Sequence, residues 1–280
     1  MGFLEGFPRM GDDQTAPWFD LQSHSTYSDG ALAPAAVVAA AEGAGVRLLA
    51  LTDHDTVDGV DEALGAARTL KCVPAVELSS VHNTHEDLHI LGYALDHTDP
   101  DLLATLVDFR TDRVRRIHAM AERLRALGFT IPELTHPSPG RPHLADALAS
   151  QTDLTKDEIF ARYLVPGTPT YVARERPTVP EAIDAIHRAK GLAVWAHPYW
   201  DMDEAIATLH AFADQGLDGV EAFYATHTEE QTKALYAAAR ERGLLTTGSS
   251  DFHGPAHDHF DRFRAFSLYG LEPDLGRLVE

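Results

Sequence analysis

Cysteine, basic side chains and long apolar runs are scarce in this chain. Its 280 residues include a single cysteine, Cys72, which excludes a disulfide framework, and nothing points to an oxidising compartment. No segment reaches the roughly 18 consecutive apolar residues that a membrane-spanning helix needs. The first residues lack the basic start and the sustained apolar run of a signal peptide. We therefore expect a cytoplasmic protein that does not bind membranes.

Positive charge is also in short supply. The chain has 23 lysine and arginine residues against 43 aspartate and glutamate residues, which gives a formal net charge of −20. Duplex DNA or RNA is bound by neutralising many phosphates with basic side chains, so this function class is not expected. A small anionic substrate remains compatible with the charge, because bound divalent ions reverse the local field.

Strand and helix patterns alternate along most of the chain. Residues 1–17 show no periodicity and are expected to form a mobile leader. From residue 18, short apolar runs alternate with helical patterns, as in WFDLQ, a helix opened by Pro34, VRLLALT and CVPAVEL. This βαβ rhythm predicts parallel strands joined by right-handed crossovers.

The alternation stops near residue 98 and resumes near residue 180. Residues 100–127 have apolar side chains at helical spacing, and two shorter helical stretches, LADALAS and KDEIFARYL, follow a proline-rich joint. We therefore expect a barrel formed by 18–97 and 179–280, with a helical insertion over 98–178 that covers the strand ends.

Potential metal ligands follow most of the predicted strands directly. They are Gln22, His24, Asp53, His54, Glu77, His197, Asp251 and His253, and a further apolar run carries His89 near its start. Parallel β/α barrels build their active sites from residues at the carboxyl ends of the strands. Imidazole and carboxylate ligands suit divalent transition metals, which lower the pKa of bound water to roughly 7. The pattern therefore predicts a multinuclear metal hydrolase.

Several of these strings, in this order, resemble one family. FDLQSHSTYSDG, LTDHDTVDG, the lone Glu77, AHP and GSSDFHG are similar to motifs of the PHP phosphoesterases, over roughly residues 18–270. The insertion resembles that of the subgroup acting on nucleoside 3′,5′-bisphosphates and on the 5′ ends of short RNAs. The resemblance implies an α/β fold, a distorted (β/α)7 barrel with a helical insertion domain.

The resemblance also implies two or three divalent ions, manganese, iron or zinc, and their ligands. One ion would be bound by Gln22, His24, Glu77 and Asp251, a second by Glu77, His89 and His197, and a third by Asp29, His54 and His253. Glu77 would bridge two of the ions. Asp29 could alternatively be a turn residue before Gly30, and His85 is a nearby competitor of His89.

Position 22 departs from the family pattern. The family has D-L-H-x-H, whereas this chain has Asp20-Leu21-Gln22-Ser23-His24. The neutral amide oxygen of glutamine is a weaker ligand than imidazole for transition metals. The first ion is therefore expected to be loosely bound, partly occupied or shifted towards manganese or magnesium, and the alternative is an impaired chain.

Substrate-facing residues are expected in the insertion and after a later strand. Arg141 and His143 resemble an R-x-H element that meets the scissile phosphate, where the planar arginine fork suits phosphate oxygens. Asp251 would take or orient a proton, and His227 lies where polar substrate contacts are expected. A solvated basic side chain is the alternative for Arg141.

The predicted function is metal-dependent hydrolysis of phosphate monoesters. The first choice is removal of the 3′-phosphate from nucleoside 3′,5′-bisphosphates, with 5′-3′ trimming of short RNA as a related activity. A histidinol-phosphate or sugar-phosphate phosphatase and a non-catalytic metal-binding PHP module are the alternatives. An amidohydrolase that cleaves C–N bonds is disfavoured, because no lysine lies at a strand end. The expected partner is a small nucleotide or short RNA, and the oligomeric state stays open.

Overall fold

The computed structural model describes residues 17–83, 85–136, 139–174, 176–199 and 204–280, except for the side chains of Glu86 and Asp87. The predicted leader, 1–17, thus lies almost entirely outside the described residues. The strands are β1 (Phe19–Asp20), β2 (Leu48–Leu51), β3 (Lys71–His82), β4 (His85–Tyr93), β5 (Leu192–Trp195), β6 (Gly219–Tyr224) and β7 (Leu245–Ser249). The barrel helices are α1 (Pro34–Gly43), α2 (Val60–Ala66), α6 (Val179–Arg188), α7 (Ala205–Asp214) and α8 (Glu229–Arg242).

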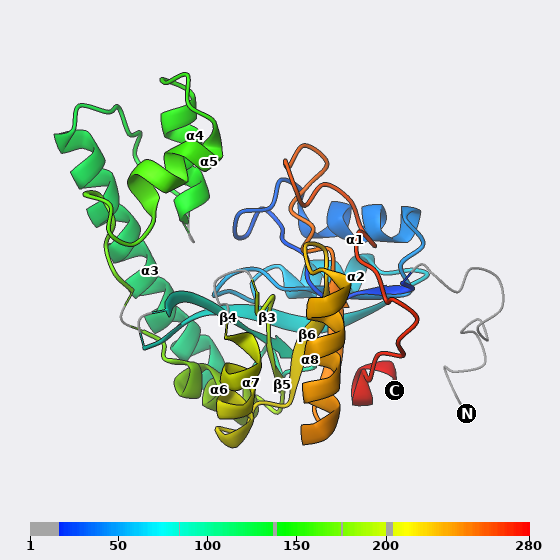
Figure 1. The fold of residues 1–280 in the computed structure, drawn as a ribbon. Helices are drawn as coiled ribbons and strands as arrows, with labels where there is room; N and C mark the ends of the chain where they lie inside the picture. Colours follow the sequence, from blue (N-terminus) through cyan, green and yellow to red (C-terminus); the bar gives the residue numbers. More distant parts are fainter. Residues whose placement is uncertain (1–16, 84, 137–138, 175, 200–203) are drawn as a thin grey trace.

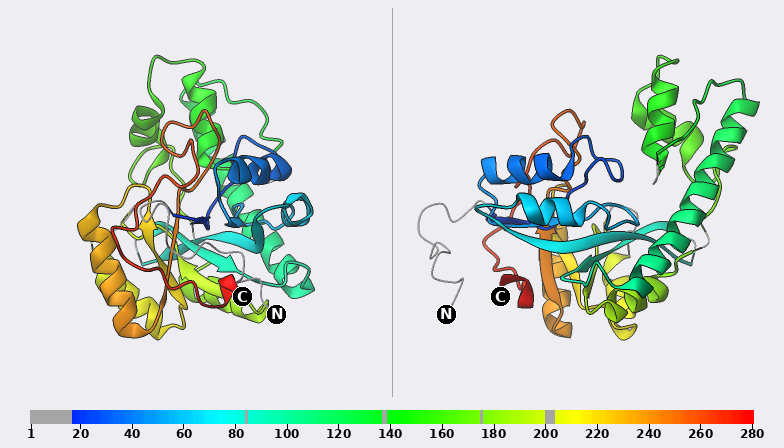
Figure 2. Two further views of the ribbon diagram at one scale, coloured as in Figure 1. Left: turned by 90° about the vertical axis from the view of Figure 1, so that its right-hand side faces the viewer. Right: turned by 180° about the vertical axis from the view of Figure 1, so that it is seen from behind.

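The strands form one seven-stranded sheet in sequence order, β1 to β7 (Figures 1 and 2). The sheet nearly closes on itself, because the Leu21 amide donates to the Gly248 carbonyl at 3.1 Å and Ser23 forms a parallel bridge with Phe252. The fold is therefore the expected α/β fold, a distorted seven-stranded barrel with helices around it and a helical insertion.

Strand β4 is the exception to the parallel order. It pairs antiparallel with β3 and with β5, whereas the other neighbouring pairs are parallel. The prediction of parallel strands joined by crossovers is thus wrong here. Only a two-residue connection separates β3 from β4, and a parallel crossover needs a dozen or more residues. The antiparallel direction brings the start of β4 to the edge where the other strands end.

Local sequence signals explain where several helices begin and end. Pro34 opens α1 at a position where its missing N–H is not needed. Thr178 and Thr228 cap α6 and α8, with Glu181 and Gln231 completing reciprocal capping boxes. Helix α8 ends at Gly243, whose φ of +66° is readily adopted by glycine. These signals place the turns between strands and helices at both ends of the barrel.

The long α3 helix (Pro100–Ala126) belongs to two hydrophobic clusters. Its first half packs Leu102, Leu106 and Phe109 into the barrel core. Its second half packs against α4 (Arg141–Ala149), α5 (Lys156–Ile159) and the π-helical turn η2 (Phe160–Leu164). Figures 1 and 2 show these shorter helices standing apart from the barrel, beside the end of α3. The insertion thus has a hydrophobic core of its own.

This second core allows a stability test. We expect Leu124→Ala to lower the free energy of unfolding by about 2–5 kcal/mol, because the Leu124 side chain is fully buried among insertion residues. Leu127, one turn further along and 54% exposed, provides the matched control, and Leu127→Ala should stay within about 0.5 kcal/mol of the wild type. Denaturant unfolding followed by circular dichroism measures both. Equal losses for the two variants would contradict the packing.

Candidate metal centre

The strand ends place the predicted ligands around one buried carboxylate, Glu77. Its Oε2 lies 3.0 Å from His24 Nε2 and 3.5 Å from His54 Nδ1. Its Oε1 lies 2.8 Å from His89 Nδ1 and 3.3 Å from His197 Nε2. The two oxygens of Glu77 therefore face different imidazoles, which is the geometry of a carboxylate that bridges two cations.

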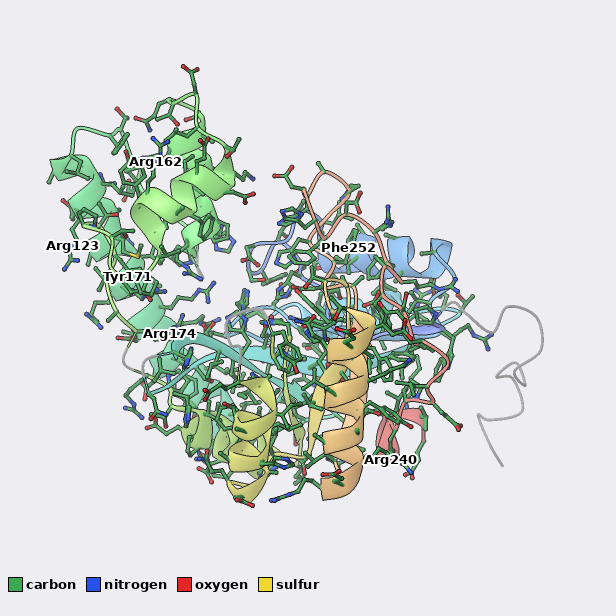
Figure 3. The ribbon with its side chains drawn as sticks, viewed as in Figure 1. Arg123, Arg162, Tyr171, Arg174, Arg240 and Phe252 are labelled. Atoms are coloured by element: carbon green, nitrogen blue, oxygen red, sulfur yellow. The ribbon has the colours of Figure 1, made fainter. Side chains whose placement is uncertain are left out.

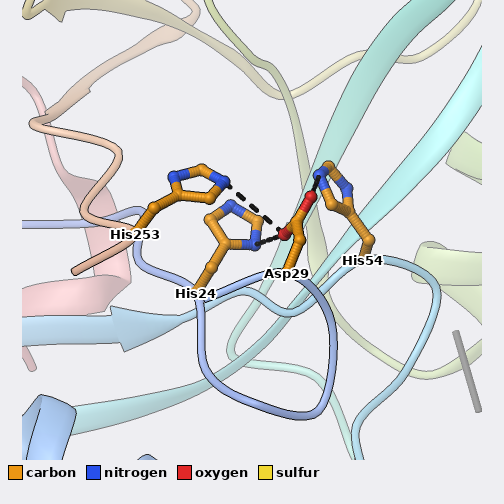
Figure 4. Close-up of side chains that lie close together, drawn as sticks. All are labelled: His24, Asp29, His54 and His253. Atoms are coloured by element: carbon orange, nitrogen blue, oxygen red, sulfur yellow. Dashed lines mark ion pairs between the residues drawn. The ribbon is translucent and has the colours of Figure 1, made fainter. Parts of the chain in front are cut away.

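Asp29 lies at the centre of a second group, at the turn that follows β1 (Figure 4). Its Oδ1 is 3.6 Å from His24 Nδ1 and 3.5 Å from His253 Nε2, and its Oδ2 is 3.7 Å from His54 Nε2. Asp251 completes the cluster, with its Oδ1 3.1 Å from His24 Nε2. The structure thus brings together His24, Asp29, His54, Glu77, His89, His197, Asp251 and His253.

The chemistry of these atoms fits divalent metal ions. Three sets have ligand atoms within 4.8 Å of one another: His24, Asp29, His54 and His253; His54, Glu77 and His89; and His24, Glu77 and Asp251. Several of their buried atoms make no hydrogen bond to any described residue, among them His24 Nε2, Asp29 Oδ1, Glu77 Oε2 and Asp251 Oδ1. Buried polar atoms are costly unless they are satisfied, and cations bound by these sets would satisfy them.

The protonation states of Glu77 and His54 suit metal binding. Burial opposes the charged form of Glu77, but the imidazoles of His54 and His89 outweigh it and hold the pKa of this carboxyl well below its usual range. Burial lowers the pKa of His54 to about 3, so its ring is neutral at physiological pH. Metal ligation requires deprotonated carboxylates and neutral imidazoles. Glu77 and His54 therefore have these forms at neutral pH, whereas His197, whose pKa is raised to about 9 because Glu77 outweighs the effect of burial, has to lose a proton when a metal binds.

Buried carboxylates beside the ligands hold the surrounding loops. Asp53 accepts hydrogen bonds from the Ser25 amide and hydroxyl and from the Ser28 hydroxyl, which fixes the turn that carries Asp29. Asp20 accepts from the Ser250 amide and hydroxyl at the end of β7. Asp20 and Asp53 therefore hold in place the segments that carry Asp251 and Asp29.

Strained backbone occurs at three residues in or next to the cluster. Asp55, His197 and Asp251 have φ values of +55°, +29° and +54°, a region that non-glycine residues rarely adopt. Such strain concentrates at functional sites, where the surrounding structure compensates for it. The buried Glu221 contributes to that compensation, because its Oε2 accepts a hydrogen bond from the His197 amide at 3.0 Å. Burial raises the pKa of Glu221 to about 8.

Gln22 is fully buried beside Glu221. Its Oε1 lies 3.4 Å from the Ser249 hydroxyl, which donates to Glu221 Oε1 at 2.5 Å, while Gln22 Nε2 has no hydrogen-bond partner among the described residues. Exchanging the amide oxygen and nitrogen, which are assigned from hydrogen bonding, would let Nε2 donate to Ser249. Oε1 would then be the atom left without a partner, and an oxygen in that position suits a cation.

A histidine at this position is expected to strengthen metal binding. Gln22→His should tighten manganese or zinc binding by about tenfold, because imidazole is the better transition-metal ligand. Isothermal titration calorimetry on metal-depleted protein measures the change. Gln22→Leu is the matched control for packing, since it has similar size and no donor atom. Unchanged affinity in both variants would show that residue 22 is not a ligand.

The two predicted substrate-facing residues of the insertion, Arg141 and His143, differ in how they lie relative to the cluster. The Arg141 guanidinium stands 5.6 Å from the centroid of the Phe160 ring, and its Nη1 lies 3.5 Å from the Leu164 carbonyl, so this arginine lies against the insertion. The His143 ring is 4.8 Å from that of His136, whose Nε2 lies 3.1 Å from the Thr26 carbonyl oxygen. His143 thus approaches the turn that carries Asp29, whereas Arg141 contacts Phe160 and Leu164 of the insertion.

His227 lies close to the cluster but is buried. Its Nδ1 is 3.2 Å from the Ala222 carbonyl, and its ring packs against Tyr199 and Tyr224. Burial lowers the pKa of His227 to about 4, so its ring is neutral. Its Nε2 is buried and makes no hydrogen bond to a described residue, which leaves one acceptor atom in the wall of the site.

The sequence patterns did not point to several neighbours of the cluster. The Tyr224 hydroxyl donates to Asp251 Oδ2 at 2.8 Å, and the His257 ring lies 5.1 Å from that of His253. Glu221 had a detectable signal, because a lone glutamate inside the apolar strand GVEAFY resembles Glu77 in its own strand. Tyr224 and His257 had none, since their roles depend on contacts between distant segments.

The comparisons with known proteins agree with this centre. The PHP domain model matches residues 20–152. A 3′,5′-nucleoside bisphosphate phosphatase from Chromobacterium violaceum is 33% identical over 84% of this chain and 87% of its own length. The chain belongs to the PHP family. It is therefore a metal-dependent phosphoesterase, in agreement with the resemblance found in the sequence.

Further proteins are similar to this chain over most of its length. A 5′-3′ exoribonuclease from Haemophilus influenzae is 34% identical over 85% of this chain and 90% of its own length. A solved structure of an amidohydrolase from Chromobacterium violaceum, with bound sulfate and no metal, has a TM-score of 0.81 at 32% identity and covers 87% of this chain and 90% of that chain. A proposed metal-dependent phosphoesterase from Bifidobacterium adolescentis has a TM-score of 0.77 at 30% identity, over 87% and 91% of the two chains.

None of the helices in the described parts of the chain is both long and apolar enough to cross a membrane.

Proposed function

We propose that this PHP protein removes the 3′-phosphate from nucleoside 3′,5′-bisphosphates and also trims short RNA from the 5′ end. The observation that carries the proposal is Glu77, whose two oxygens face four imidazoles within 3.5 Å. The named activities of the relatives from Chromobacterium violaceum and Haemophilus influenzae supply the substrate classes. The formal charge of −20 favours short anionic substrates over long ones.

The cluster would hold two or three divalent ions, manganese, iron or zinc. His24, Glu77 and Asp251, with Gln22, would bind the first, Glu77, His89 and His197 the second, and Asp29, His54 and His253 the third. Bound ions would lower the pKa of water and neutralise the charge of the transferred phosphoryl group.

The chain's own residues would position the reacting groups. Asp251 lies with Oδ1 against His24 and with Oδ2 held by the Tyr224 hydroxyl, so it would orient a proton at the centre. His143 would stabilise the departing oxygen from the insertion side, and the neutral His227 would accept a hydrogen bond from the substrate. Residues 98–178 would cover the strand ends and exclude water. Arg141 would contact a more distant part of the substrate, since its guanidinium lies against Phe160.

A phosphate-release panel with added manganese tests the proposal. It compares adenosine 3′,5′-bisphosphate, histidinol phosphate and a short 5′-phosphorylated RNA, each with the wild type and with Glu77→Gln. We expect release from the bisphosphate, shorter products from the RNA, and neither with the variant. Activity on histidinol phosphate alone would overturn the substrate assignment. If the protein bound none of manganese, iron and zinc, the proposal of a metal-dependent hydrolase would be overturned.

A further inference from the structure

One buried arginine of α3 joins the barrel to the insertion beside the metal ligands. Arg113 is 6% exposed and makes hydrogen bonds to both parts of the chain. We propose that Arg113 is a positioning residue that fixes the start of α4, and with it His143, against the strand ends that carry His54 and Glu77. The role of His143 in this proposal rests on the proposed function, whereas the fixing of α4 does not.

On the barrel side, Arg113 binds the ends of β2 and β3 together. Its Nη1 donates to the Ser79 hydroxyl at 2.9 Å and to Asp55 Oδ2 at 3.2 Å. Asp55 follows His54 directly, accepts from the Ser79 amide at 3.0 Å and donates its own amide to the Glu77 carbonyl at 2.9 Å. The guanidinium is therefore anchored on the backbone that carries two of the central ligands.

A second arginine strengthens this anchor. Arg174 lies where the chain returns from the insertion to the barrel (Figure 3). Its Nη1 is 3.9 Å from Asp55 Oδ2 and donates to the Ser79 carbonyl at 3.3 Å. Two buried guanidinium groups thus share one buried carboxylate. Removing one partner from such a buried group is strongly destabilising. The middle of α3 and the segment that returns from the insertion are thus held at the same carboxylate, Asp55.

On the insertion side, Arg113 lies against the corner that opens α4. Its Nε donates to the Pro139 carbonyl at 3.1 Å. A Cβ added at Gly140 would lie 2.9 Å from Arg113 Nη2, closer than real Cβ atoms come, so glycine permits this approach. The Gly140 amide donates to His143 Nδ1 at 3.0 Å. Arg113 therefore acts on His143 through the two residues that it touches, Pro139 and Gly140.

The corner in turn faces the metal ligands. The His143 ring lies 4.8 Å from that of His136, whose Nε2 is 3.1 Å from the Thr26 carbonyl oxygen in the turn that carries Asp29. Burial and His136 lower the pKa of His143, and the Asp29 carboxylate opposes that shift, as expected for nearby groups. A displacement of the corner would thus change the distance between His143 and the cluster.

Hydrogen exchange and kinetics of Arg113→Gln test the proposal. We expect the amides of Gly140 and His143 to exchange at least about tenfold faster, because the corner loses its anchor. With adenosine 3′,5′-bisphosphate and manganese, kcat should fall about 10- to 100-fold, the range seen when supporting partners of a site are removed, with little change in KM. Arg113→Lys keeps the charge without the fork and should recover part of kcat.

Arg116→Gln is the matched control. Arg116 is on the same helix and is 2% exposed, but its Nε donates to the Val172 carbonyl at 2.7 Å and its guanidinium lies over the Tyr171 ring. This variant should loosen residues 170–172 and leave kcat within about twofold, as expected for contacts inside the insertion core. Gly140→Ala provides a second perturbation, because its Cβ displaces Arg113 from the other side; it should give the same exchange pattern.

A double-mutant cycle separates positioning from general destabilisation. If Arg113 acts through His143, the variant with both Arg113→Gln and His143→Gln should be about as slow as His143→Gln alone. The proposal would be overturned if the losses in kcat of the two single variants multiplied in the double variant. It would also be overturned if the amides of Gly140 and His143 exchanged at the wild-type rate in both Arg113→Gln and Gly140→Ala. Accelerated exchange in a protein that releases no phosphate would support the fixing of α4 and refute the proposed function instead.

Discussion

Replacing Glu77 with glutamine is expected to lower kcat/KM for phosphate release about 1,000-fold or more, which corresponds to about 4 kcal/mol of transition-state stabilisation. The two oxygens of Glu77 lie 3.0 Å from His24 and 2.8 Å from His89. A neutral amide has one oxygen and no charge, so a single substitution removes a ligand shared by two metal groups. Steady-state kinetics with manganese and elemental analysis of the purified variant measure the two effects.

The control is a glutamate far from the centre. Glu241 lies on α8 and is exposed, and Glu241→Gln should leave activity and metal content unchanged. A Glu77→Gln protein with wild-type metal content would show that this side chain does not bridge ions. Wild-type activity in a variant that has lost its metal would show that phosphate release does not depend on metal ions.

Removal of metal is expected to abolish phosphate release and to lower the melting temperature. Glu77, Asp29 and Asp251 lie together and are buried or nearly so, and bound cations balance their charge. An ion that binds the folded state alone stabilises it by about 2.7 kcal/mol at a hundredfold excess over its Kd. Differential scanning calorimetry after chelation and after addition of manganese measures the shift. Identical melting curves would contradict a site in the folded protein.

The affinity of the cluster for metal is also expected to depend on pH. Burial lowers the pKa of His197, but Glu77 and Asp251 outweigh it and raise the pKa to about 9 in the metal-free protein. A protonated imidazole cannot bind a cation, so binding at pH 7 must release this proton. Metal affinity should therefore rise as the pH increases from 7 to 9 and then level off. Calorimetry in buffers of different ionisation enthalpy counts the released protons, and none released at pH 7 would contradict the assignment.

Several of the proposed ligands were predictable because they follow an apolar run directly, whereas Glu77 and His89 lie inside β3 and β4. His54, His197 and Asp251 follow apolar runs directly, and chain direction then places them at one edge of the barrel. The structure places His89 beside Glu77, although the direction of its strand was predicted wrongly. Its place at the start of an apolar run was the sign of an antiparallel strand, and the short turn before it was the physical reason.

The contacts between the insertion and the barrel could not be predicted from the sequence. Arg113 and Arg116 lie on the same helix, and helical periodicity alone does not distinguish a buried arginine from a solvated one. The structure buries both, and only the packing of distant segments decides that Arg113 meets Asp55 while Arg116 meets Tyr171. Arg141 was favoured by its motif, and its side chain lies against Phe160 because the insertion has its own core.

The direction of β4 also sets the dimensions of the molecule. Because β4 runs antiparallel, the chain leaves it at Tyr93, at the edge opposite the metal ligands, and α3 has to travel back along the barrel. With 27 residues, α3 spans about 40 Å, whereas the nine residues of β4 span about 30 Å. The length of α3 therefore sets how far α4 lies beyond the strand ends. One residue inserted into α3 would rotate α4 and the rest of the insertion by about 100° about the helix axis. Only insertions of about whole helical turns would therefore keep the same face of the insertion towards the strand ends.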